Sequence, residues 1–458
     1  MKKTFGLKHL HKKMPVYMLI ILLFISTIMH TYFLIKHPGS NFVEPTEEQI
    51  QEQLENGEIT ESVAKLREHT WKYGSRDAYL YTNMANQLIE HGVYGYDTRN
   101  TGKIIKNAFV TPGHPLLLVA IFHIADLFQV EQMTMVKLFN MVLSIGTVLL
   151  LYLIASLIFK NRWVGVVAAG LYTFYLTPLH YFRTALTETP GIFSFCLAIY
   201  VFLIALHTNK KILHMLFAIV FCYGVMIRPV IAPLVLIGFA VIAFRHRHQY
   251  KQFFSVAIFW GIGASVVILP WLIRNYIAFG EFILFSTHSG NSWFAGSNPF
   301  NMYDFSEYWK ERYELGMEAK DYAIMKIKEG FQENFGLWLS WFTIGKTYEL
   351  FKIPDAIYYY TSLSYMDVFK WTHHIIVNGA LITSVVAVLT RKKELLALAS
   401  VAFMYIGLSN LFLTIPRYGF FIIPVLCIIT AAGIVVLLST CSRFVIKRYD
   451  QMKNASKA

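Results

Sequence analysis

Apolar and polar residues alternate in long blocks along the chain, a pattern typical of a bundle of membrane-spanning helices. Apolar runs recur between short basic connections, and about 20 apolar residues are what an α-helix needs to cross the hydrocarbon core. The segments lack the short alternating pattern of a membrane β-barrel. The pattern predicts about ten spans, at residues 15–36, 134–159, 163–180, 190–206, 212–227, 230–244, 253–273, 371–389, 395–413 and 418–438.

One further apolar segment, residues 113–128, is too short to be a span. It gives roughly 22 Å of helix, whereas the hydrocarbon core is about 30 Å thick. We therefore expect an interfacial or re-entrant helix on the outer side. This choice fixes the direction of every later span, and with it all short loops rich in Lys and Arg fall on the side of the basic N-terminus. The positive-inside rule then predicts that both termini are cytoplasmic.

Composition agrees with an all-α polytopic membrane protein. The chain is 55% hydrophobic and only 15% charged, whereas soluble domains carry about 25% charged residues. The net charge of +13 follows the cytoplasmic loops, so no nucleic-acid partner is expected. The four cysteines lie in or beside apolar segments without a Cys-x-x-Cys pair, which argues against disulfides and cysteine-bound zinc. The first apolar run is too long for a signal-peptide core, so we interpret it as the first span.

Two long polar segments interrupt the spans and are expected outside the membrane. Residues 37–133 form the first outer loop, which begins with an acidic stretch at 41–70 and contains the interfacial helices. Residues 275–370 form the second large outer segment, with a helical pattern at 303–331. Neither segment shows a tandem repeat or the pattern of a separate soluble domain, so we expect one transmembrane domain over residues 1–458.

A short amphipathic helix in the first outer loop carries the most informative acid. Ser75 is the expected N-cap, Asp77 lies in the first turn, and Gly92 ends the helix. The apolar face consists of Leu80, Tyr81, Met84, Ala85 and Leu88. Asp77 stands at the start of this face, so we expect its carboxylate to point into the space that the spans enclose. The alternative is an acid that only stabilises the start of the helix.

Other ionisable residues stand at the outer ends of spans, where topology gives no reason for them: Arg183, Glu188, Arg228, Arg274 and Arg417. Ionisable groups at membrane depth usually face a cavity and carry function. Arginine binds phosphate oxygens through two parallel hydrogen bonds, and a carboxylate can accept the proton of an attacking hydroxyl. The set therefore suits a reaction on a phosphate-linked substrate. The alternatives are arginines that anchor helix ends at lipid headgroups and a glutamate that caps its helix.

Histidines do not predict a metal site. His288, His373 and His374 all fall in or next to the second outer segment, but their spacing fixes no ligand geometry. Nor does the chain contain an Asp-x-Asp motif suited to a metal-bound nucleotide sugar. We expect no metal ligands among these residues and no cofactor, with a dependence on a divalent cation left open.

A series of short motifs follows the order seen in a known family. The motifs are Asp77, Tyr81, Ala85, Leu88, Gly92 and Tyr94; Pro112-Gly113-His114-Pro115; Thr187-Glu188-Thr189-Pro190; Ile227-Arg228-Pro229; Pro270 to Asn275; Ser286 to Gly290 with Gly296-Ser297-Asn298-Pro299; and Arg417-Tyr418. In this order the chain resembles the GT-C fold glycosyltransferases, in the bacterial branch related to protein O-mannosyltransferases and the aminoarabinose transferases of lipid A. The chain departs from many relatives in having Ala78 directly after Asp77, and Thr111 where aminoarabinose transferases have lysine.

This resemblance implies a GT-C fold and a glycosyltransferase of the plasma membrane whose active site faces outside. The donor would be a hexose or pentose on a polyprenyl phosphate, and the acceptor a hydroxyl of a lipid, glycan or protein. Asp77 would be the catalytic base, assisted by Glu188, and Arg274 and Arg417 would hold the leaving phosphate. The remaining substrate-binding residues would be Arg183, Arg228, His114, His288 and Asn298.

Two other functions fit the same pattern of residues. A transporter or flippase for a lipid-linked or anionic solute would also place arginines and acids in a membrane cavity. The chain lacks inverted-repeat symmetry, and such a function leaves the large outer loops unexplained. A non-catalytic assembly subunit would tolerate Asp77→Ala, whereas an enzyme that uses this acid would not.

Overall fold

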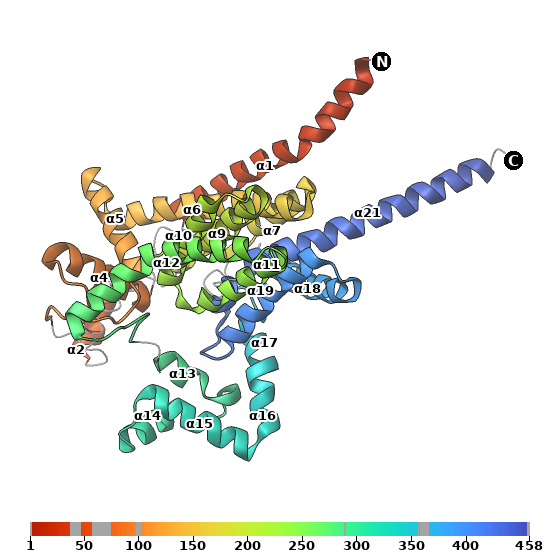
Figure 1. Ribbon diagram of the computed structural model, residues 1–458. Coiled ribbons are helices and arrows are strands. Elements are labelled where there is room, and N and C mark those ends of the chain that lie inside the picture. The colour runs from red at the N-terminus through yellow and green to blue at the C-terminus, as the bar shows by residue number, and fades with distance from the viewer. Residues whose placement is uncertain are drawn as a thin grey trace.

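The computed structural model describes residues 2–36, 47–56, 75–97, 102–287, 290–355, 357 and 366–455, and within these ranges the regular elements are all helices (Figure 1). In the first half of the chain they are α1 (Lys2–Lys36), α2 (Glu47–Glu55), α4 (Arg76–His91), α5 (Gly113–Leu127), α6 (Gln132–Phe159), α7 (Arg162–Thr173), α8 (Leu176–Tyr181), α9 (Glu188–Thr208), α10 (Lys211–Ile227) and η1 (Pro229–Leu234).

In the second half they are α11 (Val235–Arg245), α12 (Tyr250–Phe279), α13 (Gly290–Gly296), η2 (Pro299–Asn301), α14 (Phe305–Glu314), α15 (Ala319–Glu333), α16 (Phe335–Ser340), η3 (Trp341–Gly345), α17 (Lys346–Phe351), α18 (Met366–Thr390), α19 (Lys393–Ser409), α20 (Pro416–Phe420) and α21 (Ile423–Ala455). The prediction of an all-α membrane protein is therefore confirmed.

Each predicted span falls on a helix or on a pair of consecutive helices. Among the described residues, six helices are long and apolar enough to cross a membrane alone: α1, α6, α9, α12, α18 and α21. Three shorter apolar stretches accompany them, namely α5, α10 and η1 with α11. The predicted span at 163–180 is divided into α7 and α8 by a break at Phe174 and Tyr175. The helices are thus where the sequence places them, while the number of crossings stays a prediction.

Two boundaries differ from the prediction. Helix α12 continues past Arg274 and Asn275 and ends at Gly280, which has the left-handed backbone conformation of a helix C-cap. The polar residues do not end the helix because the Asn275 side chain is buried and donates to the carbonyl of Ile283. The second difference is at the start of the last predicted span, residues 418–438. The chain forms the short helix α20 there, and α21 begins at Ile423.

Helix α5 has the bounds expected for the interfacial helix. Figure 1 shows it at a steep angle to α6, and it packs against α4, α6 and α10. Gly113 permits this close approach, since a Cβ there would lie 2.5 Å from the backbone of Met226 in α10. The orientation supports the interpretation of α5 as a helix that does not follow the direction of the bundle.

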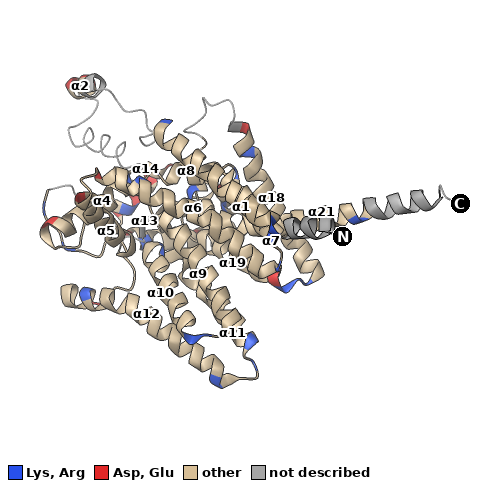
Figure 2. Ribbon diagram, turned by 90° about the horizontal axis from the view of Figure 1, so that it is seen from above, with Lys and Arg blue, Asp and Glu red and all other residues tan. Residues whose placement is uncertain are grey.

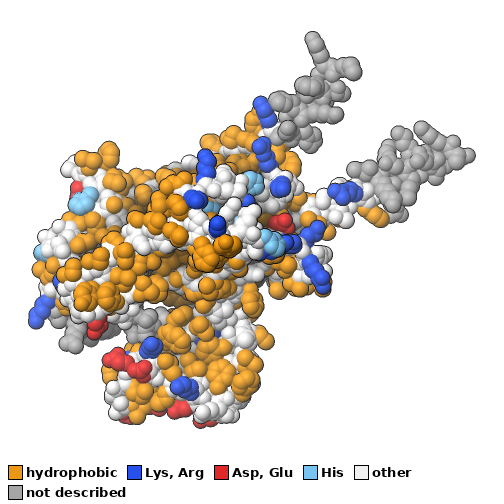
Figure 3. Space-filling model, in the orientation of Figure 1, with side chains coloured by type: hydrophobic (Ala, Val, Ile, Leu, Met, Phe, Trp, Pro, Cys, Tyr) orange, Lys and Arg blue, Asp and Glu red, His pale blue; other side chains and the backbone are white. Residues whose placement is uncertain are grey.

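The ends of the bundle differ in charge. The N- and C-terminal helices extend from the same end in Figure 1, and Lys and Arg side chains gather there in Figure 3. Figure 2 shows bases at the connection between α11 and α12, which belongs to this end. This arrangement agrees with the predicted topology, in which the basic loops and both termini are cytoplasmic.

The core lies between α6, α7, α9, α10 and the first half of α21. Side chains of α21 from Ile423 to Ala432 are almost completely buried, so this helix is central to the bundle. At the opposite end from the termini, helices α13 to α17 form an outer layer (Figure 1). This layer is joined to the bundle by Lys346, whose buried Nζ donates to the carbonyls of Asn410 and Phe412, both at 2.9 Å.

Candidate active site

The predicted amphipathic helix is α4, and its capping residues behave as expected. Ser75 has an extended backbone, and its hydroxyl accepts a hydrogen bond from the amide of Ala78 at 3.2 Å. Gly92 ends the helix in the left-handed conformation. These caps fix the first turn of α4 and place the Asp77 carboxylate at the entrance of the bundle, where 54% of its side chain stays exposed.

A second carboxylate, Glu188, starts α9 and is completely buried. Its partner is Arg228, which ends α10 directly before Pro229 interrupts the helix. The Nη1 of Arg228 donates to Oε1 of Glu188 at 2.9 Å and to the hydroxyl of Thr187 at 3.3 Å. The guanidinium also lies against the rings of Tyr418 and Phe421. Two helix ends are therefore joined by a buried ion pair.

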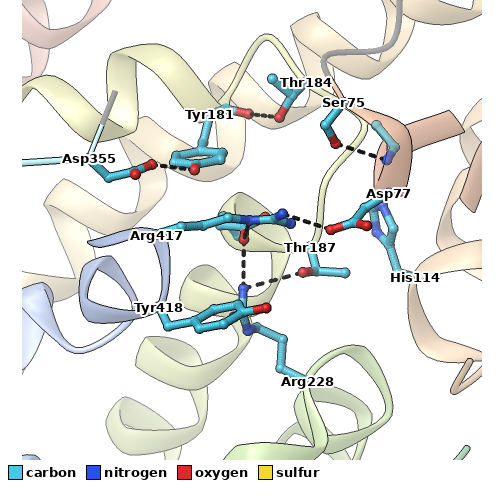
Figure 4. A network of polar contacts seen from close by, with 12 residues as sticks. Ser75, Asp77, His114, Tyr181, Thr184, Thr187, Arg228, Asp355, Arg417 and Tyr418 are labelled. Atoms are coloured by element: carbon cyan, nitrogen blue, oxygen red, sulfur yellow. Dashed lines mark hydrogen bonds and ion pairs between the residues drawn. The ribbon is translucent and has the colours of Figure 1, made fainter. Parts of the chain in front are cut away.

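Arg417 connects both carboxylates (Figure 4). Its Nε donates to Oε1 of Glu188 at 2.6 Å, and its Nη1 donates to Oδ2 of Asp77 at 2.7 Å. Asp77, Glu188, Arg228 and Arg417 thus form one chain of contacts, here called the carboxylate–arginine cluster. Two acids and two bases balance the charge of the cluster, which offsets the cost of burying Glu188 and Arg228.

The electrostatic effects of this cluster extend to its neighbours. Burial alone would lower the pKa of Arg417, but the carboxylates of Glu188 and Asp77 raise it above its ordinary value. Burial, and then the charge of Asp77, raise the pKa of the Tyr81 phenol above its ordinary value. Both groups therefore keep their protons at neutral pH, and Asp77 is the exposed carboxylate of the cluster.

Two buried acceptor atoms, Oε2 of Glu188 and Nδ1 of His114, have no hydrogen-bond partner within the described part of the chain. The Nε2 of His114 lies 2.9 Å from the carbonyl oxygen of Ala185, so this nitrogen carries the proton and Nδ1 presents its lone pair. Figure 4 shows His114 on the Asp77 side of the cluster, and its ring meets that of Tyr81 edge to face. Buried acceptors are usually satisfied, so this pair suits a ligand that brings hydroxyl donors.

The contact between Tyr181 and Asp355 was not predicted from the sequence. The Tyr181 hydroxyl donates to Oδ2 of Asp355, and the Tyr181 ring stacks on Phe420, three residues after Arg417. The pKa of Tyr181 is raised by burial and by Asp355. Asp355 lies in the second outer segment, among residues without a recognisable motif, and only the fold brings it to the site.

Other predicted ligands lie in different surroundings. The guanidinium of Arg274 donates to the carbonyls of Tyr94 and Asn107 and to Asn275, at 2.7 to 3.1 Å, and lies against three aromatic rings. It fixes the loop after α4. Arg183 is buried and donates to the carbonyl of Leu179.

Asn298 uses its amide within its own loop, since it donates to the carbonyl and accepts from the amide of Tyr303. His288 lies outside the described residues. Substrate contacts of Arg183, Arg274, Asn298 and His288 therefore stay predictions.

No group of three or more His, Cys, Asp and Glu side chains with metal-site geometry occurs in the described part of the chain. The Nε2 of His373, one of the histidines considered above, instead donates to the carbonyl of Phe351 at 2.8 Å, and its Nδ1 accepts from the Tyr175 hydroxyl at 2.9 Å. Within the carboxylate–arginine cluster, the groups that could stabilise a phosphate are the guanidiniums of Arg228 and Arg417.

A cavity of about 550 Å³ adjoins the cluster. Arg228 and Tyr418 line it, and the remaining walls come from η1, the segment after α12, Ser292 of α13, the end of α19 and the residues that follow it. Its lining is mainly apolar: Val230, Ala232, Pro233, Ile283, Leu284, Phe285, Leu408, Leu411, Phe412 and Leu413. The site thus combines an apolar cavity with one arginine, Arg228, at its edge.

Sequence comparison identifies one family. Residues 111–273 match the model of the dolichyl-phosphate-mannose-protein mannosyltransferases. This stretch includes α5, Glu188 and Arg228. No curated protein sequence matches the chain.

Solved structures show similarity over nearly the whole chain. The archaeal oligosaccharyltransferase AglB from Archaeoglobus fulgidus, in complex with an inhibitory peptide and a dolichol-phosphate, has 13% identity and a TM-score of 0.51, with 96% of this chain and 52% of that chain covered. The A. fulgidus enzyme tethered to an acceptor peptide has 12% identity and a TM-score of 0.52, with 95% of this chain and 51% of that chain covered.

ArnT from Cupriavidus metallidurans, bound to undecaprenyl phosphate, has 12% identity and a TM-score of 0.45, with 77% of this chain and 54% of that chain covered. The present chain spans about half the length of these solved proteins.

The similarity to the oligosaccharyltransferase extends to the whole arrangement of helices described above, whereas the family match rests on sequence in the middle of the chain. The chain therefore has the GT-C fold of membrane glycosyltransferases, and its residues 111–273 carry the sequence pattern of the dolichyl-phosphate-mannose-protein mannosyltransferase family.

Proposed function

We propose that this protein transfers a sugar from a polyprenyl-phosphate donor to an acceptor hydroxyl on the extracytoplasmic side of the plasma membrane. The observation that carries the proposal is the carboxylate–arginine cluster, in which the exposed Asp77 contacts Arg417 and the buried Glu188 joins Arg417 to Arg228 at the edge of an apolar cavity. The sugars that this site suits are a hexose or a pentose, and the acceptor is a lipid, glycan or protein.

Each residue of the cluster has a role that follows from its contacts. Arg228 and Arg417 each have N–H groups beyond those used for the carboxylates, and these can hold the phosphate. The isoprenoid part of the donor would enter the apolar cavity beside Arg228. Glu188 Oε2 and His114 Nδ1 can accept hydrogen bonds from sugar hydroxyls.

The charges balance if Asp77 is the base. The donor is a phosphodiester with one negative charge, and the leaving polyprenyl phosphate gains a second when the bond between the anomeric carbon and oxygen breaks. The acceptor oxygen attacks that carbon while its proton passes to Asp77, so the cluster gains one positive charge. The total charge of the site stays constant, and the arginines stabilise the charge that develops on the phosphate. A single displacement of this kind inverts the anomeric centre.

The test uses purified protein and a series of radiolabelled polyprenyl-phosphate sugars. Asp77→Asn should lower the rate of label transfer by about 10²- to 10⁴-fold, which is typical for the loss of a general base. Donor binding and thermal stability should be kept, because the Ser75 cap that starts the helix is unchanged. A chelator arm of the same assay measures any dependence of transfer on a divalent cation.

Glu90→Gln is the matched control, since Glu90 is an exposed acid on the same helix. It should transfer sugar at the wild-type rate. A stable Asp77→Asn protein that keeps the wild-type rate would falsify the assignment of the base, and failure of every donor to lose label would contradict the proposed activity itself.

A further inference from the structure

A second cavity, of about 480 Å³, lies at the opposite end of the bundle from the carboxylate–arginine cluster. Its walls are α6, α9, α10, α11 and α19. The four residues with charged or imidazole side chains that line it are Lys160, His207, Arg245 and Glu394. They stand at the ends of α6, α9, α11 and at the start of α19, on the side of the two chain termini.

The rest of the lining is apolar and reaches toward the middle of the bundle. It includes Phe195, Phe202, Phe217, Phe221 and Leu234. Along α9 the lining extends from Phe195 to His207, which is about 18 Å of helix. The cavity is therefore about as deep as one leaflet of a bilayer, half of the roughly 30 Å hydrocarbon core. Its polar end is at the surface and its apolar end is at the centre.

The polar end carries a net positive charge. Lys160 and Arg245 outnumber Glu394 by one charge, and Arg245 Nη2 donates to Oδ1 of Asn209 at 3.0 Å, which orients the guanidinium. Lys210 and Lys211 adjoin this rim in the chain, and Figure 3 shows bases gathered at this end of the molecule. Basic pockets between helices on the cytoplasmic side of membrane proteins suit the headgroups of anionic lipids.

We propose that this cavity binds an anionic phospholipid of the leaflet on the side of the chain termini. The phosphate lies between Lys160 and Arg245, the headgroup hydroxyls face Glu394, and one acyl chain fills the aromatic-lined part. The assignment follows from the match between a lipid that is charged at one end and a cavity that is basic at one end. It does not depend on the proposed glycosyltransferase activity.

The lipid would also support the distant active site. Leu234 and Val235 line this cavity, while Ala232 and Pro233 of the same segment line the outer cavity beside Arg228. Helix α19 likewise contributes Val401 to one cavity and Tyr405 to the other. A lipid on one side of this shared wall holds η1, which begins directly after Arg228. We therefore expect bound lipid to raise thermal stability.

The experiment measures lipid retention and thermal unfolding of the purified full chain. Detergent-solubilised protein is mixed with phosphatidylglycerol, phosphatidylethanolamine or phosphatidylcholine, and bound lipid is counted by native mass spectrometry. Phosphatidylglycerol should be retained in preference to the other two and should raise the melting temperature. Lys160→Gln and Arg245→Gln should each weaken its retention about fivefold. The control Lys251→Gln, at an exposed base outside the cavity, should not.

A second pair of variants tests the apolar part without changing charge. Ala397 lines the cavity, so Ala397→Trp should fill it and abolish retention of all three lipids. Ser400 lies on the exposed face of the same helix, and Ser400→Trp should retain phosphatidylglycerol normally. Equal retention of the three lipids, or unchanged retention in both glutamine variants and in Ala397→Trp, would overturn the proposal.

Discussion

The substitution Arg417→Lys tests whether the geometry of the carboxylate–arginine cluster, beyond its charge, supports transfer. The Arg417 guanidinium reaches two carboxylates through two different nitrogens, at 2.6 Å to Glu188 and 2.7 Å to Asp77. Lysine keeps the positive charge but has a single nitrogen, so it cannot reproduce both contacts in this geometry. We expect the contact with half-exposed Asp77 to be lost, because buried Glu188 competes for the only cation.

The expected magnitude follows from the contact that is lost. A hydrogen bond between charged groups contributes about 1.5–3 kcal/mol, and about 1.4 kcal/mol corresponds to a tenfold change in rate. Arg417→Lys should therefore lower kcat/KM by roughly 10- to 150-fold. The fold should survive, since Glu188 keeps its 2.9 Å ion pair with Arg228. Arg417→Ala, in contrast, removes one of the two cations that contact buried Glu188 and should cost about 1.5–3 kcal/mol of stability.

The assay combines transfer kinetics with thermal unfolding, and Arg274→Lys is the comparison. Arg274 binds the backbone carbonyls of Tyr94 and Asn107, so its replacement should lower stability more than it lowers turnover. The reasoning is refuted if Arg417→Lys transfers sugar at the wild-type rate while Arg274→Lys, still folded, loses donor binding. That outcome would place the phosphate at Arg274, as the resemblance of the Pro-Trp-x-x-Arg-Asn stretch implies.

Two further predictions concern topology and pH. Reporter fusions after Lys106 and Lys320 should report the outside and one after Arg247 the inside, and an inside signal at Lys320 would contradict the assignment of the second outer segment. Burial lowers the pKa of Lys346 from 10.5 to about 7, so between these values the unfolded chain binds more protons than the folded one. The unfolding free energy of the wild type, minus that of Lys346→Met, should then rise with pH above about 7, by up to about 1.4 kcal/mol per pH unit. If this difference does not change with pH, Lys346 is not buried as a titrating amine.

Local signals predicted the parts of the site that lie on helix ends. The caps of α4, the interruption of α10 before Pro229 and the start of α9 follow from single residues whose conformational preferences act locally. The convergence of Asp77, Glu188, Arg228 and Arg417 was expected because each stands at the outer end of a span, and topology brings such ends together. The contacts among them, and the choice of Arg417 as the link, depend on side-chain packing that a sequence does not specify.

The position of Arg274 shows why other parts could not be predicted. An arginine at a membrane interface can bind a phosphate, a headgroup or backbone carbonyls, and the motif is the same in each case. Its three carbonyl and amide contacts depend on the course of the loop after α4. Asp355, in contrast, belongs to no motif at all. It follows Pro354 in an irregular segment and contacts Tyr181 only through the tertiary fold.

Burial separates the roles of the two carboxylates that the sequence analysis treated together. Glu188 is fully buried and accepts from two guanidiniums at the same oxygen, so a proton on it would leave buried positive charge unbalanced. It is therefore best suited to orient Arg228 and Arg417 and to accept sugar hydroxyls at its second oxygen. Asp77 has one charged partner and an exposed side chain, so it can take up a proton and release it to water after each transfer. The proton of the acceptor should consequently pass to Asp77 and not to Glu188.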